Sequence, residues 1–132
     1  RINSTWGGNL VDMVRGTRII EVIQEENLLA HGVIQGERLL KGLQEIHADF
    51  PEITANPRGR GLFCALDLAT PALRDAVLVQ ARERGMMILS TGVRGLRFRP
   101  ALNLRQEDLD LGVTLLREAV ATVAASAHTL VG

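Results

Sequence analysis

The hydrophobic pattern of this sequence changes its period near Pro51, and that change restricts the possible folds more than any other feature. Before Pro51 the apolar residues recur at steps of three and four, as on helices with one buried face. After it, residues 61–68 alternate, which places Cys64 and three leucines on one side and Phe63 on the other. The sequence therefore predicts helices packed against a sheet.

Two long helices are expected before Pro51. The first spans residues 8–27, and its apolar residues predict a broad buried face made of Leu10, Met13, Val14, Ile19, Ile20 and Ile23. The second is stopped by Pro51. Its stripe consists of Leu29, Val33, Gly36, Leu40, Leu43, His47 and Phe50.

A third helix and a hairpin are expected after the alternating strand. Thr70 and Pro71 are a good cap and first-turn pair for the helix, and Gly85 closes it. A short apolar run at residues 86–89 and an alternating run at 96–99 predict two strands joined by a glycine-containing turn.

The sequence predicts a last helix that runs to about Ser126. Asn103 and Gln106 would form a capping box at its start. The glycines and arginines at residues 58–61 are interpreted as a turn that leads into the alternating strand. The expected class is α+β, with helices on one face of a small, mainly antiparallel sheet.

Composition limits the possible partners and compartment. The 132 residues are 46% hydrophobic, which suits one domain with a modest core. Fifteen basic and fifteen acidic residues cancel, which argues against nucleic-acid or polybasic membrane binding. No stretch approaches the roughly 18 apolar residues of a membrane span. The lone Cys64 lies in an apolar run, so a buried thiol in a reducing, cytoplasmic setting is expected.

Lysine and histidine are too sparse to suggest a catalytic or metal centre. The basic residues are fourteen arginines and one lysine, Lys41. Lys41 lies off the helix stripe, so it should be solvated and protonated, and unsuited to imine formation. His31, His47 and His128 lack the spacing of metal ligands, so no metal site is expected.

The first nine residues are too dense in special side chains for a frayed terminus, so we expect this chain to be part of a larger protein. Ser4, Thr5 and two glycines open directly into a helix, where free N–H groups attract an anion such as phosphate. Alternatively, Ser4 or Thr5 caps the helix and the glycines form a tight turn. Capping hydroxyls are the commoner of the two.

Arg97 and Arg99 form the second candidate site. The two-residue period of a strand sends both guanidinium groups to one side, away from Leu96 and Phe98. The planar fork of arginine matches a carboxylate through two parallel hydrogen bonds, so this side could hold an acidic substrate. The other interpretation is a solvated sheet face with ordinary surface arginines.

Three segments together resemble the C-terminal part of class III aminotransferases, which depend on pyridoxal phosphate. They are residues 3–9 (NSTWGGN), 58–62 (RGRGL) and 96–100 (LRFRP), and their order and intervals agree with that family. Trp6 and Leu10 make the sequence most similar to the branch that acts on the ε-amino group of L-lysine. The resemblance covers essentially the whole chain.

This resemblance implies the small C-terminal domain of a fold-type-I homodimer, with pyridoxal 5'-phosphate held mainly by a large domain outside this chain. Thr5 would reach the cofactor phosphate of the neighbouring subunit, with Ser4 beside it. Asn3 would line the same place on the substrate side. Arg97 would grip the α-carboxylate of the substrate.

The implied reaction transfers the ε-amino group of L-lysine to 2-oxoglutarate. The resemblance further implies that residues 1–27 enter the small domain and that residues 28–132 form it. The imine lysine would lie outside the chain, so we expect the chain alone to be inactive.

Two alternatives stay open from the sequence. The parent could prefer ornithine, acetylornithine or 4-aminobutyrate as its amino donor. The chain could instead be a non-catalytic α+β module whose arginine face binds a regulatory carboxylate.

Overall fold

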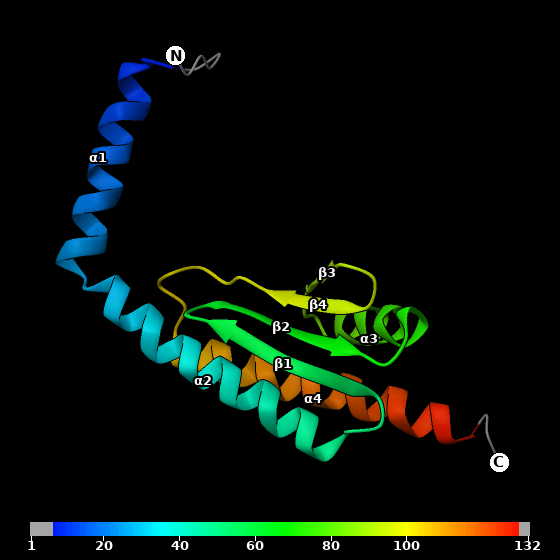
Figure 1. Cartoon of the computed structure of the whole chain (residues 1–132). Coiled ribbons are helices and arrows are strands. Elements are labelled where there is room, and N and C mark those ends of the chain that lie inside the picture. The colour runs from blue at the N-terminus through cyan, green and yellow to red at the C-terminus, as the bar shows by residue number, and fades with distance from the viewer. Residues whose placement is uncertain (1–6, 130–132) are drawn as a thin grey trace.

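The computed structural model describes residues 7–129, which form a small sheet with helices on one face (Figure 1). The elements are α1 (Leu10–Glu25), α2 (Leu28–Asp49), β1 (Thr54–Arg60), β2 (Phe63–Leu68), α3 (Pro71–Glu83), β3 (Leu89–Thr91), β4 (Gly95–Phe98) and α4 (Gln106–Thr129). The strand order is β1-β2-β4-β3, and all neighbouring strands are antiparallel. The expected α+β class is confirmed.

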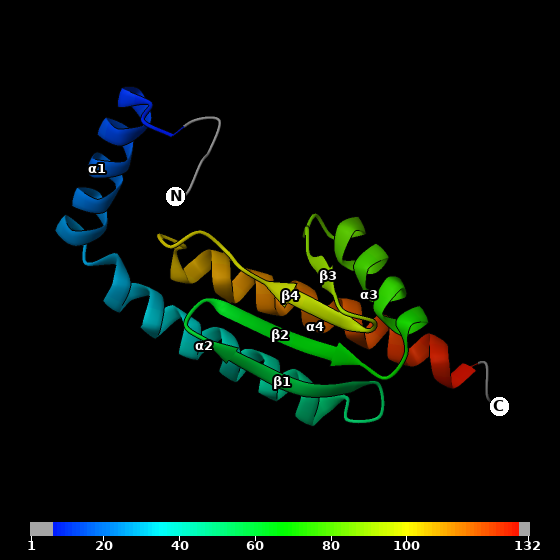
Figure 2. The same ribbon diagram turned by 45° about the horizontal axis from the view of Figure 1, so that its top comes forward.

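The helices cover one face of the sheet and leave the other open. Helices α2 and α4 run side by side beneath the strands, and α3 packs on α4 and on one end of the sheet (Figures 1 and 2). The alternation in β2 is as expected, because Cys64, Leu66 and Leu68 are buried while Phe63 is 58% exposed. The core therefore lies between the helices and one face of the sheet.

The prediction of a turn at residues 58–61 was wrong, because residues 58–60 end strand β1. Arg58 lies opposite Ala65, Gly59 opposite Cys64 and Arg60 opposite Phe63. Asparagine, proline and glycine lower the strand propensity of this segment. It is an edge strand with a register irregularity between residues 55 and 58, and such positions tolerate proline.

The expected strand at residues 86–89 is displaced along the chain. Strand β3 covers Leu89–Thr91, and residues 86–88 have no regular secondary structure. Met86 and Ile88 pack against the core instead of pairing with a strand. Packing has therefore overridden the local apolar pattern here.

The broad buried face expected for the first helix is wrong. No residue of α1 is buried, and the helix extends away from the rest of the structure (Figures 1 and 2). Its contacts with other elements are with α2, which begins after Asn27 in a left-handed backbone conformation. No helix within residues 7–129 has both the length and the apolar character needed to cross a membrane.

The stripe predicted for helix α2 is buried only in part. Gly36 and Leu43 are buried and Leu40 and Phe50 pack against the core, whereas Leu29 and Val33 are more than half exposed. The buried residues are Gly32, Gln35, Gly36, Leu39, Gly42, Leu43 and Ile46. Three of them are glycines, and an ideal Cβ on Gly36 would lie 2.2 Å from the carbonyl carbon of Gly61. The helix approaches its neighbours along glycines, which a count of large side chains cannot detect.

The caps also differ in part from the expected ones. Thr70 caps α3 as predicted, and its Oγ1 accepts from Leu73 N at 3.2 Å. Helix α4 begins at Gln106, so Asn103 lies too far upstream to cap it. The residue before the helix is Arg105, whose guanidinium donates to Asp108 in the first turn at 2.9 and 3.0 Å.

The buried thiol supports a first prediction. Cys64 is 2% exposed, and desolvation raises the pKa of its thiol, so little thiolate forms near neutral pH. We expect the folded chain to react with a thiol-specific reagent much more slowly than the chain unfolded in denaturant. The rate of labelling with and without denaturant measures this. Equal rates would contradict the burial.

An ion pair between α2 and α4 predicts a pH effect on stability. Arg38 Nε donates to Asp110 Oδ1 at 2.6 Å, and Nη2 donates to Oδ2 at 2.8 Å. This hydrogen-bonded pair lowers the pKa of Asp110. Its stabilisation is present above the unfolded carboxyl pKa of about 3.9 and is lost as the pH falls through the lower folded pKa.

We therefore expect Asp110→Asn to reduce stability at neutral pH but to change it little at strongly acidic pH. Thermal unfolding at several pH values between about 2 and 7 would show the two curves converge on the acid side. Parallel curves would mean that this pair does not contribute to the acid sensitivity.

Candidate functional site

The open face of the sheet carries a row of side chains from all four strands. The register places Arg58 beside Ala65, Ala65 beside Arg97, and Arg97 beside Leu89. Side chains directly opposite each other lie on the same face of a sheet, with Cβ atoms about 5 Å apart. Because Ala65 is short, it leaves space between the two arginines of this row.

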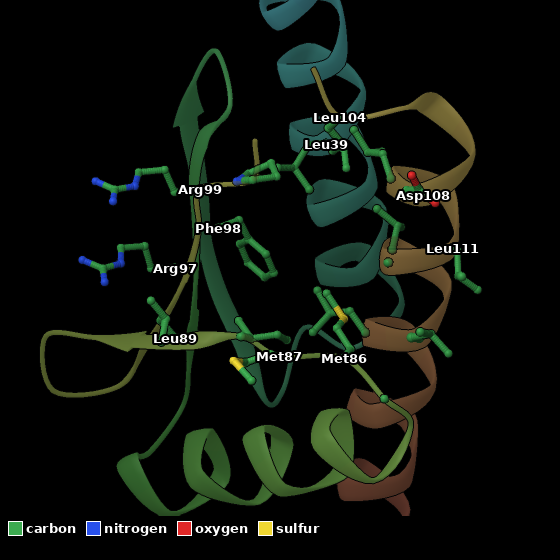
Figure 3. A pocket seen from close by; sticks show the side chains of 18 residues that line it. Leu39, Met86, Met87, Leu89, Arg97, Phe98, Arg99, Leu104, Asp108 and Leu111 are labelled. Carbon is green, nitrogen blue, oxygen red and sulfur yellow. The ribbon is translucent and has the colours of Figure 1, made fainter. Parts of the chain in front are cut away.

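A second row lies next to it at the β1–β2 turn. Arg60 is opposite Phe63, and Arg99 follows Arg97 by two residues. Figure 3 shows the side chains of Arg97 and Arg99 on one side of β4 and Phe98 on the other, among the helices. The shared side predicted for the two guanidinium groups is thus observed.

Most of the arginines in the described part of the chain are neutralised locally, but three of the four on this face are not. Within residues 7–129, eight of the thirteen arginines pair with carboxylates, namely Arg15, Arg18, Arg38, Arg58, Arg74, Arg84, Arg105 and Arg117. Asp67 lies on the open face and binds Arg58 Nη1 at 2.9 Å. Arg60, Arg97 and Arg99 have no carboxylate partner in the described part of the chain.

The charge on the open face therefore differs from that of the chain as a whole. The chain has no net charge, yet three guanidinium groups on one sheet face are left without counterions. Arg97 is half-buried and Arg99 is exposed. Such groups bind carboxylates or phosphates through paired hydrogen bonds. We define this surface, formed by Arg60, Phe63, Arg97 and Arg99, as the arginine face.

A separate apolar groove lies on the helical side of β4. Its volume is about 480 Å³, and it is bordered by residues 85–89, β4 and α4. Met86, Phe98 and Leu104 point into it, whereas the guanidinium groups of Arg97 and Arg99 point away (Figure 3). The groove therefore shares a strand with the arginine face but lacks its cationic character.

The N-terminal candidates Asn3, Ser4 and Thr5 lie outside the described residues. The described entrance to α1 begins with a left-handed Gly8, followed by Asn9. Asn9 Oδ1 accepts from Val11 N at 3.0 Å, so Asn9 is the N-cap. Capping by Ser4 or Thr5, which was one interpretation of the sequence, is thus not what the structure has.

Lys41 and two histidines contact groups that have no evident catalytic role. The Lys41 side chain is 76% exposed, and its Nζ lies 4.0 Å from a carboxylate oxygen of Glu45. His31 Nε2 is 2.7 Å from the Leu104 carbonyl oxygen, and His47 Nδ1 is 3.0 Å from Thr54 Oγ1. No cluster that could hold a metal ion occurs among the residues that the structure describes.

Sequence reasoning found Arg97 and Arg99 but missed Arg60 and Phe63 as their neighbours. Arg60 was assigned to a turn, so its position beside Phe63 could not be anticipated. Gly61 was the one residue in the sequence that could have indicated a tight connection between two strands at this point. In the structure it has a positive φ of 53° and lies between β1 and β2.

Comparison with known proteins identifies a family. The model for class III aminotransferases matches residues 2–120. The chain is 45% identical to an L-lysine-epsilon aminotransferase of Mycobacterium bovis over 123 residues, which is 93% of the chain and 27% of that relative. It is 31% identical to the mitochondrial 4-aminobutyrate aminotransferase of Sus scrofa over 121 residues, 92% of the chain and 24% of that relative.

A solved structure agrees with this result. The fold matches a lysine aminotransferase of Mycobacterium tuberculosis with a TM-score of 0.86 and 44% identity, over 92% of this chain and 28% of that one. An ornithine aminotransferase of Plasmodium yoelii shares the fold at a TM-score of 0.83 and 23% identity, over 93% and 33% of the two chains. The chain spans about a quarter of the length of the curated relatives.

Proposed function

The chain belongs to the class III aminotransferase family, and from this premise we propose that it is the C-terminal part of an L-lysine 6-aminotransferase. The full enzyme would transfer the ε-amino group of L-lysine to 2-oxoglutarate. The 45% identity to a lysine-specific relative, against 31% to one that acts on 4-aminobutyrate, supports this choice of amino donor.

The observation that carries the proposal is Arg97, a half-buried residue of the open sheet face whose guanidinium has no carboxylate partner within residues 7–129. Arg97 would bind the α-carboxylate of lysine or of 2-oxoglutarate through two parallel hydrogen bonds. This interaction orients the substrate, so its contribution to the rate is positional and involves no proton transfer. Ala65 leaves room beside Arg97 for the carboxylate to approach.

Class III aminotransferases use pyridoxal phosphate, which is an electron sink when bound. The described residues fit an anionic group of this kind, since the arginine face presents cations without internal partners. Thr5 would donate to the cofactor phosphate of the neighbouring subunit of a homodimer, with Ser4 beside it and Asn3 on the substrate side. Asn9 caps α1, so this proposal does not require Ser4 or Thr5 to cap that helix.

The remaining machinery would lie outside this chain. Lys41 is exposed beside Glu45 on the helical side of the sheet, so it is poorly placed to form an imine near Arg97. We therefore expect the chain alone to be inactive. We assign residues 1–27 to the segment that enters the small domain and residues 28–132 to the domain itself, a division supported by the break at Asn27. The buried Cys64 suits a cytoplasmic enzyme.

Amino-donor profiling of the full-length enzyme tests this function. We expect transamination of 2-oxoglutarate to be fastest with L-lysine among lysine, ornithine, acetylornithine and 4-aminobutyrate. A preference for ornithine would overturn the choice of donor while leaving the family intact. No transamination with any of these donors would favour the non-catalytic carboxylate-binding module.

A further inference from the structure

Helix α1 carries apolar residues around most of its circumference, and contacts within the described residues account for only one side of it. Ile19, Val22 and Ile23 line a shallow groove together with Leu28 and Leu102, which turns this side toward the rest of the chain. A helix with apolar residues all round is usually buried between two partners. Here the second partner is missing within residues 7–129, since no residue of α1 is buried.

The outward side is defined by Met13, Gly16 and Ile20. Their spacing of three and four residues places them on one helical stripe. Met13 and Ile20 are each more than half exposed. The ion-paired residues Arg18 and Glu21 lie on another side of the helix. We call the stripe of Met13, Gly16 and Ile20 the outer stripe of α1.

Gly16 is an independent sign of a missing contact. Glycine in the middle of an exposed helix destabilises the helix relative to alanine. In α2 the glycines coincide with close packing, because an added Cβ would lie 3.0 Å from Leu102 at Gly32, 2.2 Å from Gly61 at Gly36 and 2.8 Å from Val113 at Gly42. A Cβ on Gly16 would meet nothing within 4 Å.

We propose that the outer stripe of α1 packs against the part of the full-length enzyme that lies outside this chain, with another backbone close to Gly16. The alignment with the Mycobacterium bovis relative covers 93% of this chain but only 27% of the relative. Most of an enzyme of that length would therefore lie outside this chain and could cover the helix. The covering surface is apolar opposite Met13 and Ile20 and comes within van der Waals contact of the Gly16 backbone.

The inference rests on the proposed function only in assuming a longer enzyme, and its test does not use catalysis. Amide hydrogen exchange is measured for α1 in the 132-residue chain and in the full-length enzyme. We expect exchange at residues 13–23 to be at least about tenfold slower in the full-length enzyme, because opening of the helix would then break tertiary contacts. Equal exchange rates in the two proteins would overturn the proposal.

Substitutions at Gly16 distinguish packing from helix propensity. In the 132-residue chain, Gly16→Ala is expected to slow exchange in α1, because alanine favours the helix and meets no neighbour. In the full-length enzyme, Gly16→Leu is expected to lower the Tm by several degrees, whereas Glu21→Leu on the ion-paired side leaves it nearly unchanged. If both leucine variants have the Tm of the wild type, no backbone lies close to Gly16.

The same samples test a second copy of the chain as the occupant. Sedimentation of the 132-residue chain over a range of concentrations should show no self-association that depends on Met13 and Ile20. Self-association that Met13→Glu abolishes, together with slow exchange of α1 in the associated form, would assign the outer stripe to a second copy and contradict the proposal. Wild-type transamination of lysine is recorded separately, so a failed donor assignment stays distinct from a failed packing assignment.

Discussion

Replacing Arg97 by alanine in the full-length enzyme is expected to weaken binding of the substrate carboxylate by about 2 to 5 kcal/mol, or roughly 30-fold to 5,000-fold. The expectation follows from its position. The residue is half-buried, and its guanidinium is free of any carboxylate within residues 7–129 and projects from the open face of the sheet. The rest of the enzyme would cover the bound pair, and a desolvated pair loses both its hydrogen bonds and its charge complementarity when one partner is removed.

The measurement is the KM for lysine and for 2-oxoglutarate, with kcat determined in parallel. Arg97→Lys keeps the charge but removes the planar fork, so an intermediate loss is expected. Arg82→Ala is the matched control, because Arg82 is an exposed arginine of α3 without an ion pair in the described part of the chain. Unchanged KM values for both substrates in Arg97→Ala would exclude a carboxylate-binding role.

Replacing Gly36 by alanine is expected to destabilise the fold by about 3 kcal/mol. An ideal Cβ at this position would lie 2.2 Å from the carbonyl carbon of Gly61 and 2.3 Å from its oxygen. Both atoms are backbone, so no side-chain rotation relieves the overlap. Helix α2 would have to move away from the β1–β2 turn, which carries Arg60 and Phe63 of the arginine face.

Gly112→Ala provides the control for this experiment, since a Cβ there meets the nearest atom, Met86 Cε, at an ordinary 3.7 Å. That variant should be neutral or gain up to about 1 kcal/mol from helix propensity. Denaturant titration of the two variants and the wild type gives both free energies of unfolding. Equal stability of Gly36→Ala and Gly112→Ala would mean that α2 and the turn are not in close contact.

Much of the secondary structure could be predicted because it depends on residues that are close together in the sequence. The cap at Thr70, the end of a helix before Pro51 and the alternation of β2 each arise from a few neighbouring residues. The common side of Arg97 and Arg99 follows from the same two-residue period. These features require no knowledge of which segments are in contact.

Other features depend on contacts between distant segments, which local patterns do not encode. Strand β1 exists because β2 supplies its hydrogen bonds despite a poor local propensity. The buried face of α2 follows glycines that fit against Gly61 and Val113, so large apolar residues indicated only part of it. Helix α1 is the opposite case, because its apolar pattern predicted burial but none of its residues is buried within residues 7–129.

The sequence by itself determined the α+β class, the apolar side of β2 and the shared side of two arginines, because side-chain periodicity follows directly from backbone geometry. Only the tertiary structure decided that Arg60 and Phe63 join them, that Asp67 neutralises Arg58, and that Arg97 is left unpaired. Pairing and burial depend on which distant segments meet, and that choice is made by packing the whole core.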